Sequence, residues 1–467
     1  MSRGAPGGRA ATSRLNLTTV LAVVLPVVCA AALSLVRPAD EADTTTAPTL
    51  TALTRSTVVC PSAMTGAPGV AVTSAAEDVD GPVRVGLGEG KQDARIASGA
   101  ATSVDAGDGP VAVYGEDETA PGLVAARFGS DRPAVATCLA PAPRAWFTGV
   151  GAGAGHTSVL ELTNPDSGTA VADVVVYGRR GVVNAPRLRG VSVTGGSSVR
   201  LDLSSIVPRR DELALEVISA RGRIGATVLD RFDPLGRGEP TSEWLPPQAE
   251  PSAANLLMGL APGSDARRTL VVANSGQDEV RATVQVVAEQ SVFTPQGVPD
   301  LRIPPQSVAK LNLSGALAKI VAKGGVSGLL VTANQPVTAS LRSYADGDLS
   351  EAVADPVVDG AATVLLPPGT KNGERTLLLA GASSAGTVDV VASTASGEQL
   401  DSQKVDVSPD RGVTVELPAK TELVTVTPTG ATVRGAVLLS DDRGATIVPV
   451  TTSAMNGLVP AVQPGLP

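Results

Sequence analysis

HTSVLELTN, at His156–Asn164, returns twice further along the chain, as RRTLVVAN at Arg267–Asn274 and as RTLLLA at Arg375–Ala380. A second stretch repeats with it: SSVRLDLS (Ser197–Ser204) matches SVAKLNLS (Ser307–Ser314). Corresponding leucines in the first two copies lie 110 positions apart. A fixed period of this length indicates tandem copies of one domain rather than a solenoid of short units. We count three copies.

Within each copy, apolar and polar residues alternate as they do in β-strands. Val199, Leu201 and Leu203 alternate with Arg200 and Asp202, so the three apolar side chains share one face. The first copy holds about seven such runs, each ended by Gly, Pro, Asn or Asp, which is typical of an immunoglobulin-like antiparallel β-sandwich. The main helical pattern, SGALAKIVAK, predicts a short helix between two strands of the second copy.

The composition excludes several kinds of protein. The chain has 467 residues, a formal net charge of −9, one histidine and three cysteines. So few histidines and cysteines exclude a tetrahedral zinc site, which takes about four N or S ligands. An acidic balance with scattered arginines argues against nucleic acid, which requires a concentrated basic face. Only nine residues are aromatic (four Phe, three Tyr, two Trp), so the core must consist of aliphatic side chains.

The N-terminus predicts export through a membrane. Three arginines precede an apolar run at 15–36, which would span about 33 Å as a helix and cross a ~30 Å hydrocarbon core. Acidic residues follow it, which places the N-terminus in the cytoplasm and the bulk of the chain outside. The alternative is a cleaved signal peptide, since Ala30-Ala31-Ala32 offers a cleavage site. We expect a single-pass cell-membrane protein, or a secreted one if the signal is cleaved.

Cysteine usage agrees with export. Apart from Cys29, only Cys60 and Cys138 remain, an even pair on the exported side. A bridge between them would close a loop of about 80 residues and stabilise the fold by roughly 4–5 kcal/mol in the chain-entropy model. Two free buried thiols are the alternative.

The fold class is therefore mainly β, with one N-terminal transmembrane helix, a disulfide-stapled β domain and three tandem immunoglobulin-like sandwich repeats. The β domain does not align with the repeats. The predicted boundaries are a cytoplasmic tail (1–14), a transmembrane signal-anchor (15–36), a Thr-rich linker (37–54), the N-terminal β domain (55–144), repeats at 145–234, 255–348 and 362–450, linkers at 235–254 and 349–361, and a disordered tail (451–467).

Two stretches carry a resemblance to a known family: TVVCPS (Thr57–Ser62) and the run from Ala136 to Gly178 that contains ATCLAPAPRAWF and HTSVLELTNPDSG. On these the chain resembles an actinobacterial family of exported proteins of unknown function, the DUF5719 type. The resemblance implies one N-terminal anchor, a domain with paired cysteines and an Asn-Pro strand-turn-strand repeat. The third copy departs from that pattern, with Ala380-Gly381 where the first has Asn164-Pro165. The resemblance implies a location and not a mechanism.

The chain offers little sign of catalytic chemistry. GVGAGAGH (Gly149–His156) precedes a strand and not a helix, so it predicts a loop rather than a phosphate-binding turn. His156 lacks a G-x-S-x-G partner and is expected to be a surface residue. Acidic turns near Asp78, Asp346 and Asp441 fit turn chemistry better than calcium binding. Trp146 and Trp244 are expected to pack between domains. We therefore predict no catalytic, cofactor-binding or metal-binding residues, and only Cys60 and Cys138 as site residues.

These observations favour a non-enzymatic, membrane-anchored cell-envelope protein whose tandem sandwiches act as a structural or protein-interaction module. The expected partners are the membrane, through residues 15–36, and other cell-envelope proteins. A cell-wall or glycan-binding module is the alternative, and it would gain if Trp146 and Trp244 were exposed on one face. A hydrolase is a third possibility. It would gain if a pocket gathered His156 or paired carboxylates with shifted pKa values.

Overall fold

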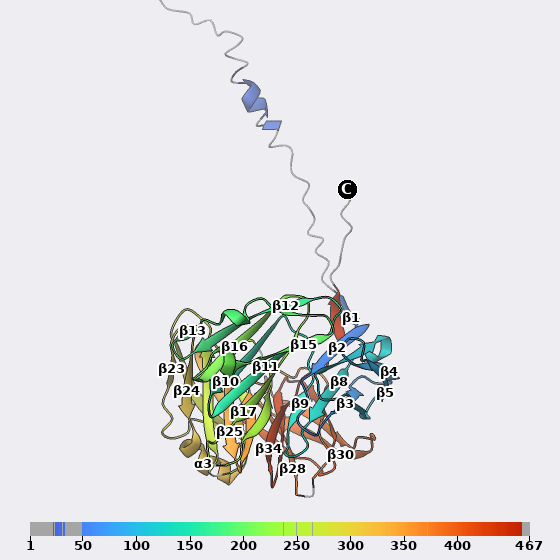
Figure 1. Ribbon diagram of the computed structural model, residues 1–467, viewed down its shortest axis with the longest axis vertical. Helices are drawn as coiled ribbons and strands as arrows, with labels where there is room; N and C mark the ends of the chain where they lie inside the picture. Colours follow the sequence, from blue (N-terminus) through green and yellow to red (C-terminus); the bar gives the residue numbers. More distant parts are fainter. Residues whose placement is uncertain are drawn as a thin grey trace, which may run out of the picture. The chain divides into compact units, whose positions relative to one another are not determined.

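The computed structural model describes residues 22, 24–29, 31–32 and 49–459, with gaps at 237, 249, 264 and 371. The chain divides into two compact units, Met1–Thr51 with Leu458–Pro467, and Ala52–Gly457. β1 (Thr49–Ala52) and β35 (Asn456–Val459) pair as a two-stranded sheet. The larger unit is mainly β and consists of several antiparallel sheets (Figure 1).

The ends of the chain test the predicted boundaries only in part. Most of the predicted anchor at 15–36 lies outside the described residues, as do 1–14 and 460–467. Within the described part of the chain, no helix combines the length and hydropathy needed to cross a bilayer. β1 lies inside the predicted linker 37–54 and β35 inside the predicted disordered tail 451–467. These two short segments take strand structure because each supplies backbone partners to the other.

The N-terminal segment of the larger unit spans β2 to β9. Its alternation is plain in β4, where Val83 and Val85 are buried and Arg84 is exposed. The strands are β2 (Arg55–Cys60), β3 (Gly69–Ser74), β4 (Asp80–Gly86), β5 (Gln92–Ala97), β6 (Thr102–Asp105), β7 (Val111–Glu116), β8 (Leu123–Phe128) and β9 (Val135–Thr137), with a 3-10 helix η1 (Asp117–Thr119).

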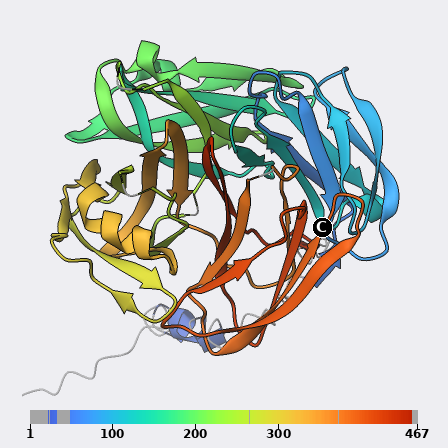
Figure 2. The same ribbon diagram turned by 90° about the horizontal axis from the view of Figure 1, so that it is seen from below.

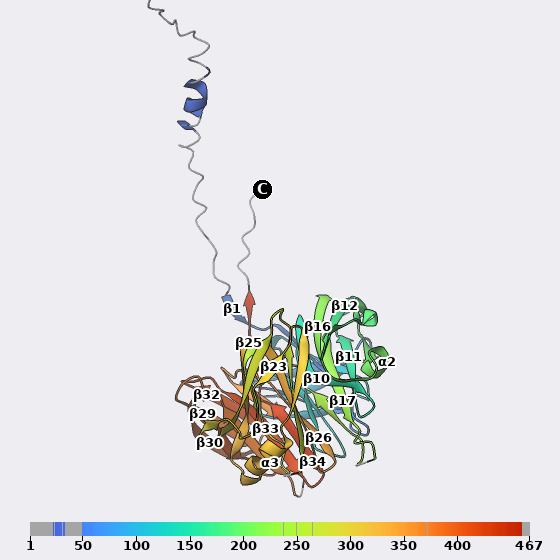
Figure 3. The same ribbon diagram turned by 90° about the vertical axis from the view of Figure 1, so that its left-hand side faces the viewer.

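The first repeat spans β10 to β18, and a short helix, α2 (Leu203–Ile206), packs beside β11 (Figure 3). Its strands are β10 (Arg144–Gly153), β11 (His156–Asn164), β12 (Ala170–Gly178), β13 (Gly181–Val183), β14 (Val191–Val193), β15 (Ser197–Asp202), β16 (Arg210–Arg221), β17 (Gly225–Phe232) and β18 (Thr241–Leu245), with a 3-10 helix η2 (Pro186–Leu188).

The second repeat spans β19 to β26 and contains α3 (Ser314–Lys323), the helix that the sequence predicts. Its strands are β19 (Ser252–Met258), β20 (Arg267–Asn274), β21 (Val280–Ala288), β22 (Val292–Phe293), β23 (Leu301–Ile303), β24 (Ser307–Asn312), β25 (Val326–Ala345) and β26 (Asp348–Val353). The third repeat consists of β27 (Ala362–Leu365), β28 (Glu374–Ala380), β29 (Gly386–Ser393), β30 (Gln399–Val407), β31 (Val413–Glu416), β32 (Leu423–Thr429), β33 (Arg434–Asp441) and β34 (Gly444–Pro449).

All four segments share one strand order. The strands of a segment, counted along the chain, form two sets, one in the order first-sixth-third-fourth and the other in the order fifth-second-seventh-eighth. The two sets are separate sheets in the N-terminal segment and the third repeat, whereas in the first repeat β10 pairs with β11 and joins them, and in the second repeat β25 joins them. In the third repeat these sheets are β27-β32-β29-β30 and β31-β28-β33-β34; in the N-terminal segment they are β2-β7-β4-β5 and β6-β3-β8-β9. In the first repeat β13 and β14 share the fourth place, and in the second β22 and β23 do. The long β25 provides both the sixth and the seventh strands of the second repeat.

The N-terminal segment thus has the same strand order as the three repeats, although its sequence does not align with them. The shared order depends on which strands pair and not on particular side chains. Many aliphatic sequences satisfy the same pairing, so sequence comparison alone leaves this segment outside the repeat.

The predicted linkers 235–254 and 349–361 each contain part of a sheet. β18 lies in the first, and most of β26 lies in the second. Both strands are edge strands that neighbouring segments cover, so they are buried on both faces and carry buried acidic residues such as Glu243 and Glu351. Burial on both faces removes the polar-apolar alternation by which a half-buried strand is recognised.

The hydrophobic clusters cross the boundaries between segments. One cluster joins Val135 of the N-terminal segment to the third repeat, and a second joins Leu378 of the third repeat to the second. Trp146 of the first repeat packs with Val271 of the second, and Trp244 packs with Ala136. Each segment therefore shares apolar contacts with two others. Figure 2 shows the four groups of strands, coloured blue, green, yellow and orange in chain order, around a common centre.

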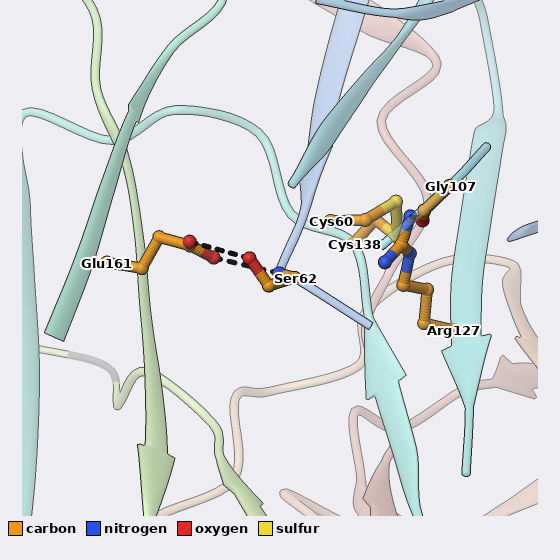
Figure 4. Close-up of a disulfide and its surroundings, with 6 residues drawn as sticks. All are labelled: Cys60, Ser62, Gly107, Arg127, Cys138 and Glu161. Carbon is orange, nitrogen blue, oxygen red and sulfur yellow. Dashed lines mark hydrogen bonds between the residues drawn. A yellow bond between two sulfur atoms is a disulfide. The ribbon is translucent and has the colours of Figure 1, made fainter. Parts of the chain in front are cut away.

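The predicted disulfide between Cys60 and Cys138 is present and buried (Figure 4). It connects the end of β2 to the residue after β9, so it joins the two sheets of the N-terminal segment. Two residues further on, the amide and hydroxyl of Ser62 donate hydrogen bonds of 2.8 and 2.7 Å to the buried Glu161 carboxylate of β11. The same stretch of chain is therefore fixed to its own segment by a covalent bond and to the first repeat by two hydrogen bonds.

Shared cores predict cooperative unfolding. Leu160 is fully buried in the core of the first repeat, so Leu160→Ala should lower the free energy of unfolding by about 2–5 kcal/mol. Because the segments share contacts, we expect differential scanning calorimetry to show the main transition of the whole unit moving to lower temperature. Val182→Ala, in the same repeat but 47% exposed, is the matched control and should change little. A separate early transition from the first repeat alone would contradict the shared-core model.

Candidate functional site

The eighth strands of the four segments meet at the centre of the larger unit. β18 packs against β26, and β26 packs against β34. β34 packs against β9, and Ala134 and Ala136 at β9 contact Trp244 of β18. We call β9, β18, β26 and β34 the central strands. They belong to four different sheets, so side chains from all four segments converge there.

An apolar cavity of about 250 Å³ lies at the C-terminal ends of the central strands. Trp244 and Leu245 of β18, Val353 of β26 and Pro449 of β34 line it, together with residues 135–137 of β9. The remaining wall comes from β2, β10, β16 and β17 and from the chain beside these strands and the central strands. The cavity thus belongs to no single segment and exists only in the assembled unit.

Proline follows or ends most of the central strands. Pro246, Pro247, Pro356 and Pro449 all line the cavity. Proline cannot donate a ladder hydrogen bond and has a fixed φ, so it ends a strand and stiffens the chain that leaves it. The rim of the cavity is therefore rigid.

Gln248 is the main buried polar side chain in the cavity wall. Its Nε2 donates to the carbonyl of Ala339 at 3.0 Å, and its backbone N–H donates to the carbonyl of Trp146 at 2.8 Å. These bonds fix the side chain, which is 6% exposed. Its Oε1 has no hydrogen-bond partner among the described residues. A buried acceptor without a partner costs about 1–3 kcal/mol, so this atom favours a donor from a bound molecule or solvent.

A buried ionic network joins the first and second repeats. The guanidinium of Arg342 in β25 donates to both carboxylate oxygens of Glu212 at 3.1 and 3.0 Å, and to the carbonyl of Gly149 at 3.2 Å. Burial is the largest single effect and opposes ionisation of Glu212. The charge and hydrogen bonds of Arg342, with smaller effects of His156 and Lys310, together outweigh burial and lower the pKa of that carboxyl. A fully paired buried ion pair fixes the relative position of the elements that carry it, and breaking it is costly.

His156 belongs to the same network and is buried, so the expectation of a surface histidine is wrong. Its Nδ1 lies 2.9 Å from an Arg342 nitrogen, and its Nε2 lies 2.7 Å from Asp230 Oδ2. Nδ1 therefore accepts from the guanidinium and Nε2 donates to the carboxylate. The sequence predicts a surface position because His156 follows a glycine-rich, loop-like stretch. In the structure, packing against β25 buries the His156 side chain.

Ser158 completes the group without forming a nucleophilic triad. Its hydroxyl donates to Asp230 Oδ1, and it accepts a hydrogen bond from the Gly151 amide at 2.8 Å. In a triad the serine proton passes to the histidine, with the carboxylate behind it. Here the aspartate stands between serine and histidine, and Ser158 is fully buried. The arrangement holds β11 and β17 together and does not prepare a nucleophile.

Three buried carboxyls lie on two of the central strands. Burial and the nearby Asp348 charge raise the pKa of Glu243 well above its usual value. Burial and the nearby Asp230 charge likewise raise the pKa of Glu351. Burial raises the pKa of Asp348 to about 6, although hydrogen bonds from Thr241 and the Ala445 amide oppose the shift. Sequence reasoning missed this group because Glu243 and Glu351 lie in segments interpreted as linkers, while Asp348 was interpreted as a turn residue.

The acidic turns that the sequence singled out do not form a metal site. Asp348 and Asp441 come from two of these turns and line one small cavity, but Asp441 already pairs with Arg443. Among the described residues, no group of three or more His, Cys, Asp or Glu side chains has the arrangement to hold a metal ion. Trp146 and Trp244 are both buried, at 3% and 5% exposure.

Comparison with known protein families identifies a match over the repeats. A family model described as "Family of unknown function (DUF5719)" matches residues 128–418, more than half of the chain. The chain belongs to this family. The match runs from the end of β8 to just beyond β31, so it includes the ionic network and three central strands of this DUF5719 member. No curated protein matches the chain.

The raised pKa of Glu351 predicts a pH-dependent stability. An unfolded glutamate ionises near pH 4.3, whereas the folded one holds its proton to higher pH, so its contribution to stability falls as pH rises through the folded pKa. Glu351→Gln keeps the shape and removes the buried charge. We expect the melting temperature of the variant to lie roughly 2 °C or more above that of wild type at pH 8. At pH 4 the two melting temperatures should be equal.

Glu89→Gln, at an exposed position, is the matched control and should show no such pH dependence. Thermal melts followed by circular dichroism at both pH values measure the effect. A difference between Glu351→Gln and wild type that is the same at pH 4 and pH 8 would contradict the buried-charge explanation.

Proposed function

We propose that this DUF5719 member is a non-enzymatic, extracytoplasmic, membrane-anchored protein of the cell envelope, and that its tandem sandwiches act as one rigid structural or protein-interaction module. The observation that carries the proposal is the sharing of hydrophobic clusters and buried ion pairs across segment boundaries. Segments joined in this way hold their loops and edges at fixed distances. A fixed arrangement of edges suits the binding of a partner at several points at once.

The disulfide suggests an extracytoplasmic domain, because such bonds persist in oxidising compartments. The apolar run at 15–36 and the arginines before it support a single-pass anchor with a cytoplasmic N-terminus. Secretion after cleavage of the run is the alternative.

The buried polar groups support a structural role more than an enzymatic one. His156, Ser158 and Asp230 satisfy one another inside the first repeat, and Arg342 connects them to the second. A cell-wall glycan would need flat aromatic faces for stacking, and Trp146 and Trp244 are buried. These observations favour a protein partner over a glycan.

We also propose that the four segments are immunoglobulin-like sandwiches with exchanged outer strands. The second strand pairs with the fifth and the third with the sixth, as in immunoglobulin domains. The seventh strand, however, pairs with the second instead of the sixth. This exchange brings the eighth strand to the edge of its sheet, from which it reaches the centre of the unit.

Membrane attachment gives the first test. We expect the full-length chain to sediment with the membrane fraction and to resist extraction by high salt or alkaline carbonate, because an apolar helix of this length inserts into the bilayer. Immunoblotting of fractions provides the measurement. Recovery of most of the protein from the medium, with a new N-terminus near Leu33, would show that the run is a cleaved signal.

Site-specific photocrosslinking tests the interaction role. Val182 of β13 and Phe293 of β22 are exposed apolar residues at the fourth-strand edges of the first and second repeats. The full-length protein in its native membrane carries a photoreactive amino acid at one of these positions. We expect both positions to give crosslinks to the same envelope protein. Ser402, exposed on the corresponding β30 of the third repeat, is the polar control. No crosslink above that control from either position would contradict this proposal.

A further inference from the structure

We propose that the cavity at the ends of the central strands is a binding site for a small, largely apolar molecule that carries one hydrogen-bond donor. The site is separate from the edges that would bind a protein partner, so this inference does not depend on the proposed function.

The size of the cavity sets the size of the ligand. An apolar cavity of about 150 Å³ accepts benzene, and this one measures about 250 Å³. A substituted benzene ring, or an aliphatic group of similar volume, therefore fits. Trp244, Leu245 and Val353 offer it apolar contact from two segments. Such contact is worth about 25 cal/mol per Å² of apolar surface removed from water.

An unpaired polar atom of the wall defines the chemistry of the ligand. Gln248 lies in the wall, is more than nine-tenths buried, and has an Oε1 without a partner, while its Nε2 is held by Ala339. The unpaired atom of this amide is therefore an acceptor. A hydroxyl or N–H on the ligand satisfies it, whereas a ligand with only acceptors leaves it unpaired.

A covalent bond and backbone hydrogen bonds fix one side of the wall. Val59 and Pro61 flank Cys60, and Thr137 and Leu139 flank Cys138, and all four of these neighbours line the cavity. The disulfide and the mutual backbone hydrogen bonds of Val59 and Leu139, at 2.8 and 3.1 Å, fix this side. Prolines fix the rim. A preformed site loses little conformational entropy on binding, which favours affinity for a small molecule.

Access comes from one side. Ala140, Ala142 and Arg144 are exposed, whereas the other lining residues are buried or half-buried, so these three mark where the cavity opens to solvent. Ala140 and Ala142 lie in the chain between β9 and β10, and Arg144 is the first residue of β10. A small molecule reaches the site there without separation of the four segments.

The two tryptophans of the chain provide a probe and an internal reference. Trp244 lines the cavity, whereas Trp146 packs in a different hydrophobic cluster. Its neighbour in β10, Ala145, lines the cavity, so the side chain of Trp146 lies on the opposite face of that strand. The full-length chain in detergent, labelled with 5-fluorotryptophan, should give two ¹⁹F NMR signals, and Trp146→Phe assigns them. Benzyl alcohol, which has a donor, is compared with anisole, an isomer without one.

We expect benzyl alcohol to shift the Trp244 signal saturably and the Trp146 signal much less. Anisole should bind about fivefold more weakly, since one neutral hydrogen bond is worth about 1 kcal/mol. Gln248→Met removes the acceptor and should make the two isomers bind alike. A shift of Trp244 no larger than that of Trp146, or a shift that does not saturate, would overturn the proposal, and equal affinities for the two isomers in wild type would overturn the role of Gln248.

Filling the cavity gives an independent check. Ala136→Leu and Ala354→Leu add methylenes to two parts of the wall and should each weaken benzyl alcohol binding at least tenfold. Ala220→Leu, an exposed change outside the lining, is the matched control and should bind as wild type does. An unchanged Trp146 signal shows that a variant is folded. If folded filled variants bind as tightly as wild type, the ligand lies elsewhere and the proposal is wrong. If a variant does not fold, the comparison of the two isomers in wild type still decides it.

Discussion

The constraint on which the structure depends is the burial of four edge strands against one another. In each segment the eighth strand lies at the edge of its sheet, and an exposed edge of this kind invites aggregation. β9, β18, β26 and β34 pack together at the centre, so each segment covers the edges of its neighbours. The shared hydrophobic clusters and the merging of four segments into one compact unit follow from that packing.

The same packing explains why charged groups lie inside a protein with so aliphatic a core. Where the central strands converge, Glu243 and Glu351 are buried from both sides, and burial raises the pKa of each. Nearby, Arg342 and Glu212 form a paired group with His156 at the seam of the first two repeats. Paired charges of this kind add specificity of docking more than stability, because their desolvation offsets much of their attraction.

One end of the centre is charged and the other is apolar, and this division suits two different roles. The charged end, with its carboxyls and ion pairs, fixes how the segments dock. The apolar end contains the cavity with Trp244 and the single acceptor of Gln248. Cys60 and Cys138 lie beside that cavity, so the bond that suggests an extracytoplasmic domain also holds part of its wall.

The sequence by itself determined the strands, the three-fold repeat, the helix at Ser314–Lys323 and the Cys60–Cys138 pair, because alternation, period and cysteine count are local or countable signals. Only the tertiary structure decided that the N-terminal segment shares the strand order, that β18 and β26 are strands, and that His156 is buried. Glu243 and Glu351 are 108 positions apart, and each lies in a stretch without alternation. Their meeting depends on how whole cores pack, and no local pattern encodes that contact.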